Sequence, residues 1–348
     1  MMPPPKPGRA PRAVLILIAI LGAGAAVLAV LHVTKRPEVR KRPYVHDLSA
    51  LRKVDPRLVL YRLAGTIRTP YRDARAIALG PKGRIYLGAD KAIRILPAQA
   101  VTAGFDPAKV RTIPTAQTPR CLAIDETGGA YAGVGPAVEV YSPAGKLLSR
   151  WAVPAGKRPA VLTSIVLCRG NVFVADAGNR VVLRYDPAGK LLGRIGRKDK
   201  ARGVPGLVVP SPYLDLAIGP DGLLRVVNPG RLRVEAYTFD GDLELWWGRA
   251  SSRDISGFAG CCNPVAVAFD PRGRLVTAEK GVRRVKLYDA DGKFLGVVAP
   301  PEAFADTAPL GRKVGELDLA VAEDGRVFVL DPYTSEVKIF AAKVEGNR

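Results

Sequence analysis

The chain has 348 residues, including 36 glycines and 30 prolines, a composition that suits many turns and short strands in one large all-β domain. Lysine and arginine number 53 against 32 aspartates and glutamates, so the net charge of +21 should attract anionic partners. Both histidines, His32 and His46, precede residue 57, which excludes Ser-His-Asp triads, Cys-His dyads and histidine-ligated zinc from the domain that follows.

A basic tail, residues 1–12, precedes an unbroken run of 19 apolar or small residues from Ala13 to Leu31. A helix rises about 1.5 Å per residue, so this run nearly spans a hydrocarbon core of about 30 Å. We predict a transmembrane anchor over residues 13–33. A cleaved signal peptide is the alternative, because residues 23–25 (Ala-Gly-Ala) resemble a cleavage site, but the apolar run continues past them.

A basic linker, residues 34–56, follows the predicted anchor, and its charge suits an anionic membrane surface. More basic residues follow the apolar run than precede it, a balance that by itself favours a cytoplasmic domain. A short basic tail before an apolar core is, however, typical of an export signal. We therefore expect a single-pass protein of the cytoplasmic membrane with its domain on the periplasmic side.

One pattern then recurs six times: an apolar strand, a polar turn with glycine, and two more short strands. The copies cover residues 76–96, 122–141, 164–186, 216–240, 267–289 and 319–340. Their turn glycines are Gly83, Gly128, Gly170, Gly222, Gly273 and Gly325. Periods of about 40 to 50 residues with several short strands predict a β-propeller rather than a helical solenoid.

A fourth strand follows most copies, but the sixth copy lacks one because the chain ends soon after it. A matching segment, RLVLYRLAG at residues 57–65, stands before the first copy. Pairing of the two chain ends would close the ring and protect its edges. We therefore predict an all-β, six-bladed β-propeller over residues 57–341, closed by its N-terminal strand, preceded by one transmembrane helix and followed by a C-terminal tail, residues 342–348.

The copies resemble NHL repeats. The best match is VADAGNRVVLRYDPAGKLLGRIG at residues 174–196, where residues 175–181 match the hallmark turn of that family. The fifth copy together with the residues before it, 260–289, resembles an uncharacterised group of bacterial membrane-anchored NHL-type propellers. The resemblance implies the architecture of residues 57–340 and says little about function.

Oxygen-bearing side chains end the second strand of the last four copies: Asp176, Asn228, Glu279 and Asp331. Around a channel mouth they could hold a divalent cation such as Ca²⁺. The distantly similar gluconolactonase-like propellers bind a divalent metal on this face for lactone hydrolysis, which implies a metal-dependent, lactonase-like hydrolase as one possible function. The alternative is that aspartate and asparagine simply favour tight turns.

The adjacent pair Cys261-Cys262, followed by Asn263, precedes the inner strand of the fifth copy, and Cys121 begins the inner strand of the second. The pair could form a vicinal disulfide, bind a soft metal or contact a redox partner. Together with Asn263 and Cys121 it is our candidate site for a ligand or partner. The alternative is that the cysteines are small buried residues packed near the channel.

Basic residues cluster on one connector, at Arg194, Arg197, Lys198, Lys200 and Arg202, and on another turn, at Arg283 and Arg284. These clusters predict a patch for anionic partners. Because some NHL propellers bind RNA on a positive face, a cytoplasmic domain would favour RNA. An exported domain makes nucleic acid an unlikely partner and favours acidic envelope polymers or an acidic subunit.

Taken together, these features predict a membrane-anchored, non-enzymatic binding or scaffold propeller that presents its channel face to a partner protein or small ligand. Function in such a fold lies in the loops rather than in the blades. Two other functions stay open: the metal-dependent hydrolase, and an accessory subunit of a membrane redox complex that is contacted through the cysteine pair.

Overall fold

A computed structural model describes residues 16, 20–24, 52–305 and 315–343. The chain divides into two compact units, residues 1–47 and 48–348. Residues 16 and 20–24 are helical. No helix among the described residues is both long and apolar enough to cross a membrane. Most of the predicted anchor and linker lies outside the described residues, so the anchor stays a prediction.

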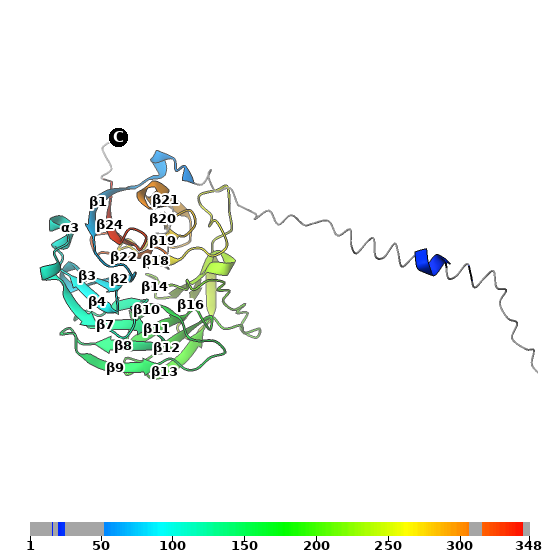
Figure 1. The fold of residues 1–348 in the computed structure, drawn as a ribbon, viewed down its shortest axis with the longest axis horizontal. Coiled ribbons are helices and arrows are strands. Elements are labelled where there is room, and N and C mark those ends of the chain that lie inside the picture. The colour runs from blue at the N-terminus through cyan, green and yellow to red at the C-terminus, as the bar shows by residue number, and fades with distance from the viewer. Residues whose placement is uncertain (1–15, 17–19, 25–51, 306–314, 344–348) are drawn as a thin grey trace, which may run out of the picture. The chain divides into compact units, whose positions relative to one another are not determined.

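The second unit contains six four-stranded antiparallel sheets, arranged as the blades of a propeller (Figure 1). Blades 1 and 2 contain β2 (Ala74–Gly80), β3 (Arg84–Ala89), β4 (Ala92–Leu96), β5 (Arg111–Pro114), β6 (Leu122–Ile124), β7 (Ala130–Val134), β8 (Ala137–Tyr141) and β9 (Leu147–Ala152). Blades 3 and 4 contain β10 (Leu162–Cys168), β11 (Asn171–Asp176), β12 (Val181–Tyr185), β13 (Leu191–Ile195), β14 (Leu216–Ile218), β15 (Leu224–Asn228), β16 (Arg233–Tyr237) and β17 (Leu243–Trp247). Blades 5 and 6 contain β18 (Ala266–Phe269), β19 (Leu275–Glu279), β20 (Arg284–Tyr288), β21 (Phe294–Ala299), β22 (Asp318–Val321), β23 (Val327–Asp331), β24 (Glu336–Ala342) and β1 (Tyr61–Arg68).

Apart from helical Arg52, the helical structure among the described residues of this unit lies in short connectors. The one-turn α3 spans Ala100–Ala103. The 3₁₀ turns cover Pro56–Leu58, Pro81–Gly83, Pro107–Lys109, Pro229–Arg231 and Pro301–Ala303. Each 3₁₀ turn begins with proline, whose fixed φ and missing N–H suit the first helical position.

The ring is closed by the N-terminal strand, as the sequence predicts. Strand β1 pairs antiparallel with β24, from Tyr61 opposite Ala342 to Arg68 opposite Glu336. An ion pair of 3.0 Å between Arg68 Nε and Glu336 Oε1 reinforces the end of this ladder. The pairing thus holds the first and last strands of the propeller in one blade.

The hydrophobic core lies between neighbouring blades. Ile85 of blade 1 packs in one cluster with Leu330 and Ile339 of blade 6, and all three side chains are fully buried. Each such side chain contributes about 1.5–3 kcal/mol through removal from water. The middle strands β15, β19 and β23 are buried along their whole length, whereas the outer strand β17 exposes most of its side chains. The large apolar clusters therefore combine buried residues of two neighbouring blades.

The six predicted turn glycines all adopt positive φ, between +69° and +93°. They lie in the turns between the first and second strands of the blades, on the opposite side of the sheets from the channel site described below. A left-handed backbone of this kind is open to glycine without the cost that a Cβ atom imposes. The regular spacing of these glycines therefore reflects a conformational requirement that repeats in every blade.

Candidate functional site

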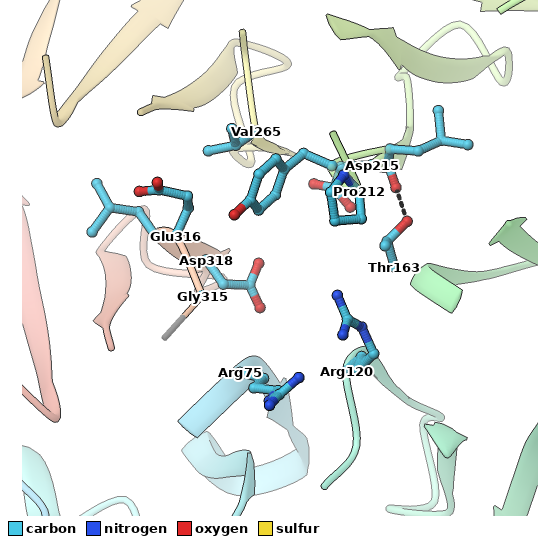
Figure 2. Close-up of a pocket in the computed structure, with 12 residues that line it drawn as sticks. Arg75, Arg120, Thr163, Pro212, Asp215, Val265, Gly315, Glu316 and Asp318 are labelled. Carbon is cyan, nitrogen blue, oxygen red and sulfur yellow. Dashed lines mark hydrogen bonds between the residues drawn. The ribbon is translucent and has the colours of Figure 1, made fainter. Parts of the chain in front are cut away.

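The segments that lead into the inner strands of all six blades meet at one mouth of the central channel, where they line a cavity of about 330 Å³ (Figure 2). Each blade contributes at least one residue to this channel site: Arg75, Arg120, Thr163, Asp215, Val265 and Asp318, with Tyr213 and Glu316 beside them. Because the contributors come from every blade, the site exists only in the closed ring.

Arg75 and Arg120 form the basic side of the channel site. Nε of Arg75 lies 2.6 Å from Oδ1 of Asp73, whose Oδ2 accepts a hydrogen bond of 2.6 Å from Thr118. The guanidinium group of Arg120 has no hydrogen bond or ion pair to any described residue. Burial and the nearby charge of Arg75 lower the pKa of Arg120. Arg120 is thus a partly buried cation that a ligand could neutralise.

Asp215 and Asp318 lie on the acidic side of the site, and each also joins two blades. Oδ2 of Asp215 accepts a hydrogen bond of 2.6 Å from the N–H of Val267 in blade 5. Oδ2 of Asp318 accepts one of 2.8 Å from the N–H of Ile77 in blade 1. Figure 2 shows the Asp318 carboxyl group directed into the cavity. The two carboxyl groups therefore tie inner strands together and face the ligand space.

In blade 3, hydroxyl groups rather than carboxyl groups connect this blade to the next one. Ser164 Oγ accepts a hydrogen bond of 3.2 Å from the N–H of Leu216 in blade 4. Thr163 Oγ1 donates one of 2.6 Å to the carbonyl oxygen of Leu214 (Figure 2). Side chains at equivalent places thus connect successive inner strands and hold the channel wall in position.

The surroundings of the two aspartates favour their protonated forms. Burial raises the pKa of Asp215 to about 6. Burial and the charge of Asp215 together raise the pKa of Asp318 to about 7. The acidic side of the channel site therefore changes its charge near neutral pH.

Glu316 and Tyr213 extend the acidic side. Oε2 of Glu316 lies 3.9 Å from Nε of Arg283, and burial nevertheless raises the pKa of Glu316. Burial raises the pKa of Tyr213 to about 12, so its hydroxyl group stays protonated at neutral pH. Nζ of Lys280 lies 5.0 Å from the centre of the Tyr213 ring, within the range of a cation–π contact.

The channel site therefore places arginines opposite carboxyl groups across a small cavity. Figure 2 shows Arg75 and Arg120 on one side and the carboxyl groups of Asp215, Glu316 and Asp318 on the other. A ligand with an anionic group near Arg120 and a cationic or hydrogen-bond-donating group near Asp318 would satisfy both sides.

Three strand-end residues hold the connectors that lead into the channel, and two of them belong to the predicted metal ring. Asp176 Oδ1 accepts a hydrogen bond of 3.0 Å from the N–H of Val161, and Asn228 Oδ1 accepts one of 2.9 Å from the N–H of Val208. Asp90 plays the same part in blade 1, where Oδ1 accepts a hydrogen bond of 2.7 Å from the N–H of Asp73. These oxygens already have protein partners.

Glu279 and Asp331, the other members of the predicted ring, are fully buried in ion pairs. Glu279 lies 3.1 Å from Arg284 Nη2 and 2.5 Å from Lys286 Nζ. Asp331 Oδ1 accepts a hydrogen bond of 2.7 Å from Arg283 Nη2. Across the part of the chain that the structure describes, no three histidine, cysteine, aspartate or glutamate side chains converge on a possible metal position. Each member of the predicted ring therefore has a protein partner, and the Ca²⁺ ring with the hydrolase that depends on it stays a prediction.

The cysteine pair lies near the channel with both thiols free. The sulfur atoms of Cys261 and Cys262 are 3.3 Å apart, with Cys261 exposed and Cys262 buried. The hydrogen bond to Cys262 and partial burial raise the pKa of Cys261. Burial also raises the pKa of Cys121, so neither thiol has the lowered pKa of a reactive cysteine.

Asn263 has a structural role in this region. Its Oδ1 accepts a hydrogen bond of 2.8 Å from the N–H of Lys280, and its Nδ2 donates to the carbonyl oxygen of Lys280 at 3.0 Å. Nδ2 also donates to the carbonyl oxygen of Ala259 at 2.5 Å. The side chain thus fixes the connector that contains the cysteine pair to the turn of blade 5, and it has no free amide group for a ligand.

The predicted basic residues separate into two groups. Arg194, Arg197, Lys198 and Lys200 are exposed, and Arg202 forms an ion pair of 2.5 Å with Asp242. The predicted patch does not extend to Arg283 and Arg284. Both are buried, because they pair with carboxylates inside the domain.

Sequence reasoning missed the channel site itself. Its two central aspartates lie in an identical tetrapeptide, Leu-Asp-Leu-Ala, at residues 214–217 and 317–320. Two arginines lie one repeat position earlier than these aspartates: Arg75 precedes Ala76, and Arg120 precedes Cys121. Alignment of the blades on their inner strands would have shown these four residues at the channel entrance.

Fold and site together define a six-bladed β-propeller with a polar channel mouth. Among solved structures, virginiamycin B lyase from Staphylococcus aureus matches with a TM-score of 0.55 at 12% identity, over 82% of this chain and 100% of that one. A streptogramin B lyase matches with a TM-score of 0.55 at 10% identity, over 82% and 98% of the two chains. A protein of unknown function from Bacteroides thetaiotaomicron matches with a TM-score of 0.56 at 15% identity, over 82% and 76%.

These likenesses show the propeller fold and nothing finer. No protein-family model and no curated protein matches the chain.

Proposed function

We propose that residues 57–341 form an NHL-type binding propeller. Its channel site would hold a small ligand, or the end of a partner protein, that carries opposite charges. The observation that carries this proposal is the unpartnered guanidinium group of Arg120, which faces the cavity together with Asp215 and Asp318 (Figure 2). A partly buried cation without a protein partner is stabilised by a ligand that supplies an anion.

The size of the cavity supports a small ligand. Its volume of about 330 Å³ is near the lower limit of ligand pockets, which is roughly 300 Å³. An amino acid, a short peptide or a single chain terminus has matching size and charge separation. We therefore propose binding rather than turnover as the primary activity.

The lyase activity of the matched structures is not part of this proposal. One of them is a catalytically inactive histidine-to-alanine variant of virginiamycin B lyase, in complex with quinupristin. Here the only histidines are His32 and His46, both before the propeller. A reaction that depends on a histidine of the propeller therefore has no group to carry it in this chain.

Calorimetric titration with amino acids and dipeptides would test the proposal. Substitution Arg120→Ala should weaken binding of the best ligand by roughly 10- to 100-fold, because one charge-assisted contact contributes about 1.5–3 kcal/mol. Arg62→Ala, an exposed position on β1, is the matched control and should leave affinity unchanged. Equal affinities of the Arg120 variant and the unaltered protein, or absence of any ligand in the panel, would contradict the proposal.

We also propose that the propeller is tethered to the cytoplasmic membrane by residues 13–33 and faces the periplasm. The support is the 19-residue apolar run of the sequence. A compartment-sensitive reporter fused after Arg348 tests the topology. Activity of the reporter outside the cytoplasm is expected, and activity inside would reverse the assignment.

A second candidate function is acid–base catalysis at the same site. It is favoured by the pKa of Asp318, about 7, beside that of Asp215, about 6, because such values suit proton transfer at neutral pH. Substitution Asp318→Asn separates the two functions. A catalyst would lose turnover of a bound compound, whereas a binding site would lose only the pH dependence of affinity.

A further inference from the structure

A second cavity, of about 530 Å³, lies on blade 3 and shares no lining residue with the channel site. It is bounded by the connector between β9 and β10, by the turn between β11 and β12, and by the end of β13. We call it the blade 3 cleft. Five basic side chains line it: Lys157, Arg158, Arg180, Arg194 and Arg197.

The positive charge of the blade 3 cleft is not neutralised by the protein. All five basic residues are exposed, and none has a hydrogen bond or ion pair from its side chain to a described residue. The only acidic lining residue is Asp176. Its carboxylate is already engaged by the N–H groups of Val161 and Asn179 and by the Asn179 side chain. The five cations therefore face an open cavity without a counter-charge.

The base of the cleft is held in place by the hallmark turn of blade 3. Asn179 Oδ1 accepts a hydrogen bond of 3.1 Å from the N–H of Arg158, and Asn179 Nδ2 donates one of 3.0 Å to the Arg158 carbonyl oxygen. Asp176 Oδ2 accepts a third bond, of 2.7 Å, from the same amide group. Below these contacts, Val181 and Leu183 are buried. The backbone that presents the basic side chains is thus fixed before any ligand arrives.

We infer that the blade 3 cleft binds a compact oligoanion, a ligand with two or more phosphate-type groups. Guanidinium groups match the geometry of phosphate oxygens by paired hydrogen bonds, and four of the five basic residues are arginines. The cavity volume lies within the range of about 300–1,000 Å³ that small-molecule sites occupy. A concave site of this size favours a compact ligand over the flat surface of a large partner.

This inference goes beyond the proposed function and does not depend on it, because the two sites have separate lining residues. The probe for the test is sodium tripolyphosphate, titrated into the full chain in detergent at low ionic strength. One-to-one, saturable binding is expected. Raising the salt concentration should weaken it, since the contacts are between opposite charges.

The variant is the double substitution Arg158→Gln and Arg197→Gln. It should weaken tripolyphosphate binding by roughly 30-fold or more, because two charge-assisted contacts are lost. The matched control is Arg62→Gln with Arg84→Gln, which removes the same charge from exposed positions elsewhere. Equal weakening by the two double variants, or absence of saturable binding to the unaltered protein, would overturn the inference. Unchanged melting curves would verify that both variants fold.

Vesicles distinguish the source of the phosphate groups. Binding to cardiolipin vesicles, whose lipid headgroup carries two phosphates, would identify a lipid headgroup as the ligand if it requires Arg158 and Arg197 and is displaced by tripolyphosphate. Tripolyphosphate binding without such vesicle binding would identify a soluble oligoanion as the ligand. Either result supports the inference that the blade 3 cleft binds an oligoanion. An RNA oligonucleotide that binds through the same two arginines while tripolyphosphate fails to compete would overturn it.

Discussion

The turns between the second and third strands of blades 3 and 5 contain the same residue in opposite surroundings. In each, an arginine immediately precedes the third strand: Arg180 before β12 and Arg283 before β20. Arg180 is exposed and has no partner among the described residues. Arg283 is 4% exposed, donates to Asp331 at 2.7 Å, and lies 3.7 Å from the centre of the Tyr333 ring.

The neighbouring blade, rather than the turn, makes this difference. Arg283 Nη1 donates to the carbonyl oxygen of Ala305 at 2.9 Å, and the Phe304 ring centre lies 5.7 Å from its guanidinium carbon. The connector into blade 6 therefore covers Arg283. Arg180 instead lines the open blade 3 cleft. An arginine in a blade turn thus serves stability or ligand binding according to what packs beside it.

The largest effect should come from Glu279→Ala in blade 5. The substitution leaves Arg284 and Lys286 buried without their carboxylate, and breaking a buried pair in this way costs about 3–5 kcal/mol. Denaturant unfolding measures the loss. Glu244→Ala, on the exposed face of β17, is the control and should change stability little. A loss below about 1 kcal/mol would show that the buried pairs contribute little to stability.

Arg283→Gln should destabilise the domain by about 2–4 kcal/mol, because Asp331 would keep its buried charge and lose its cationic partner. Thermal and denaturant unfolding measure this change. A loss of stability as small as that of a surface substitution would show that the buried Arg283 side chain contributes little to the free energy of unfolding.

Asp318 should make stability depend on pH. Its pKa rises to about 7 in the folded state from 3.8, so the folded protein binds more protons than the unfolded chain between pH 4 and 7. The free energy of unfolding should therefore fall as pH rises through this range, by at most about 1.4 kcal/mol per pH unit for one proton. Asp318→Asn keeps an oxygen acceptor for Ile77 and should flatten the profile. An unchanged profile would show that another group titrates.

Lys286 should have the opposite effect at alkaline pH. Burial lowers its pKa to about 8 from 10.5, although the Glu279 charge opposes the shift, so the folded protein binds fewer protons than the unfolded chain between these values. The free energy of unfolding should rise as pH increases from 8 towards 10.5, again by at most about 1.4 kcal/mol per pH unit. Lys286→Met should remove this rise. Melting temperatures across the range measure it, and a falling curve in the unaltered protein would contradict it.

The smallest effect is expected from Arg180→Gln, the blade 3 counterpart of Arg283→Gln. An exposed side chain without a partner should change stability by no more than about 0.5 kcal/mol. The same unfolding experiments measure both arginines. A large loss of stability in the Arg180→Gln variant would show that the exposed and the buried turn arginine contribute similarly to stability.

Periodicity in the sequence was enough to predict the propeller. Six turn glycines at nearly regular spacing marked six blades, and the unmatched segment at residues 57–65 indicated the closing strand, which the structure begins at Tyr61. The difference arises because Pro56–Leu58 forms a 3₁₀ turn, capped by a hydrogen bond of 2.9 Å from Arg57 N–H to Asp55. Local hydrogen bonding thus set a boundary that the apolar pattern could not locate.

Side-chain chemistry was harder to predict than fold. The strand-end residues Asp176, Asn228, Glu279 and Asp331 suggested a cation site because they occupy matching positions. In the structure, each oxygen-bearing side chain is engaged by a connector, a neighbouring turn or an arginine of its own region. The position of a residue in the repeat predicts on which side of the blade it lies. It does not predict which side chain or backbone group the residue contacts.

The sequence by itself determined the strands, the number of blades and the means of closure, because these follow from apolar alternation and from glycine turns that each repeat contains. Only the tertiary structure decided which charged residues are available to a ligand. Arg120 and Asp318 are almost 200 residues apart in the sequence and meet at the channel because the ring closes. Likewise, Arg283 is buried and Arg180 is exposed because burial depends on the adjacent blade.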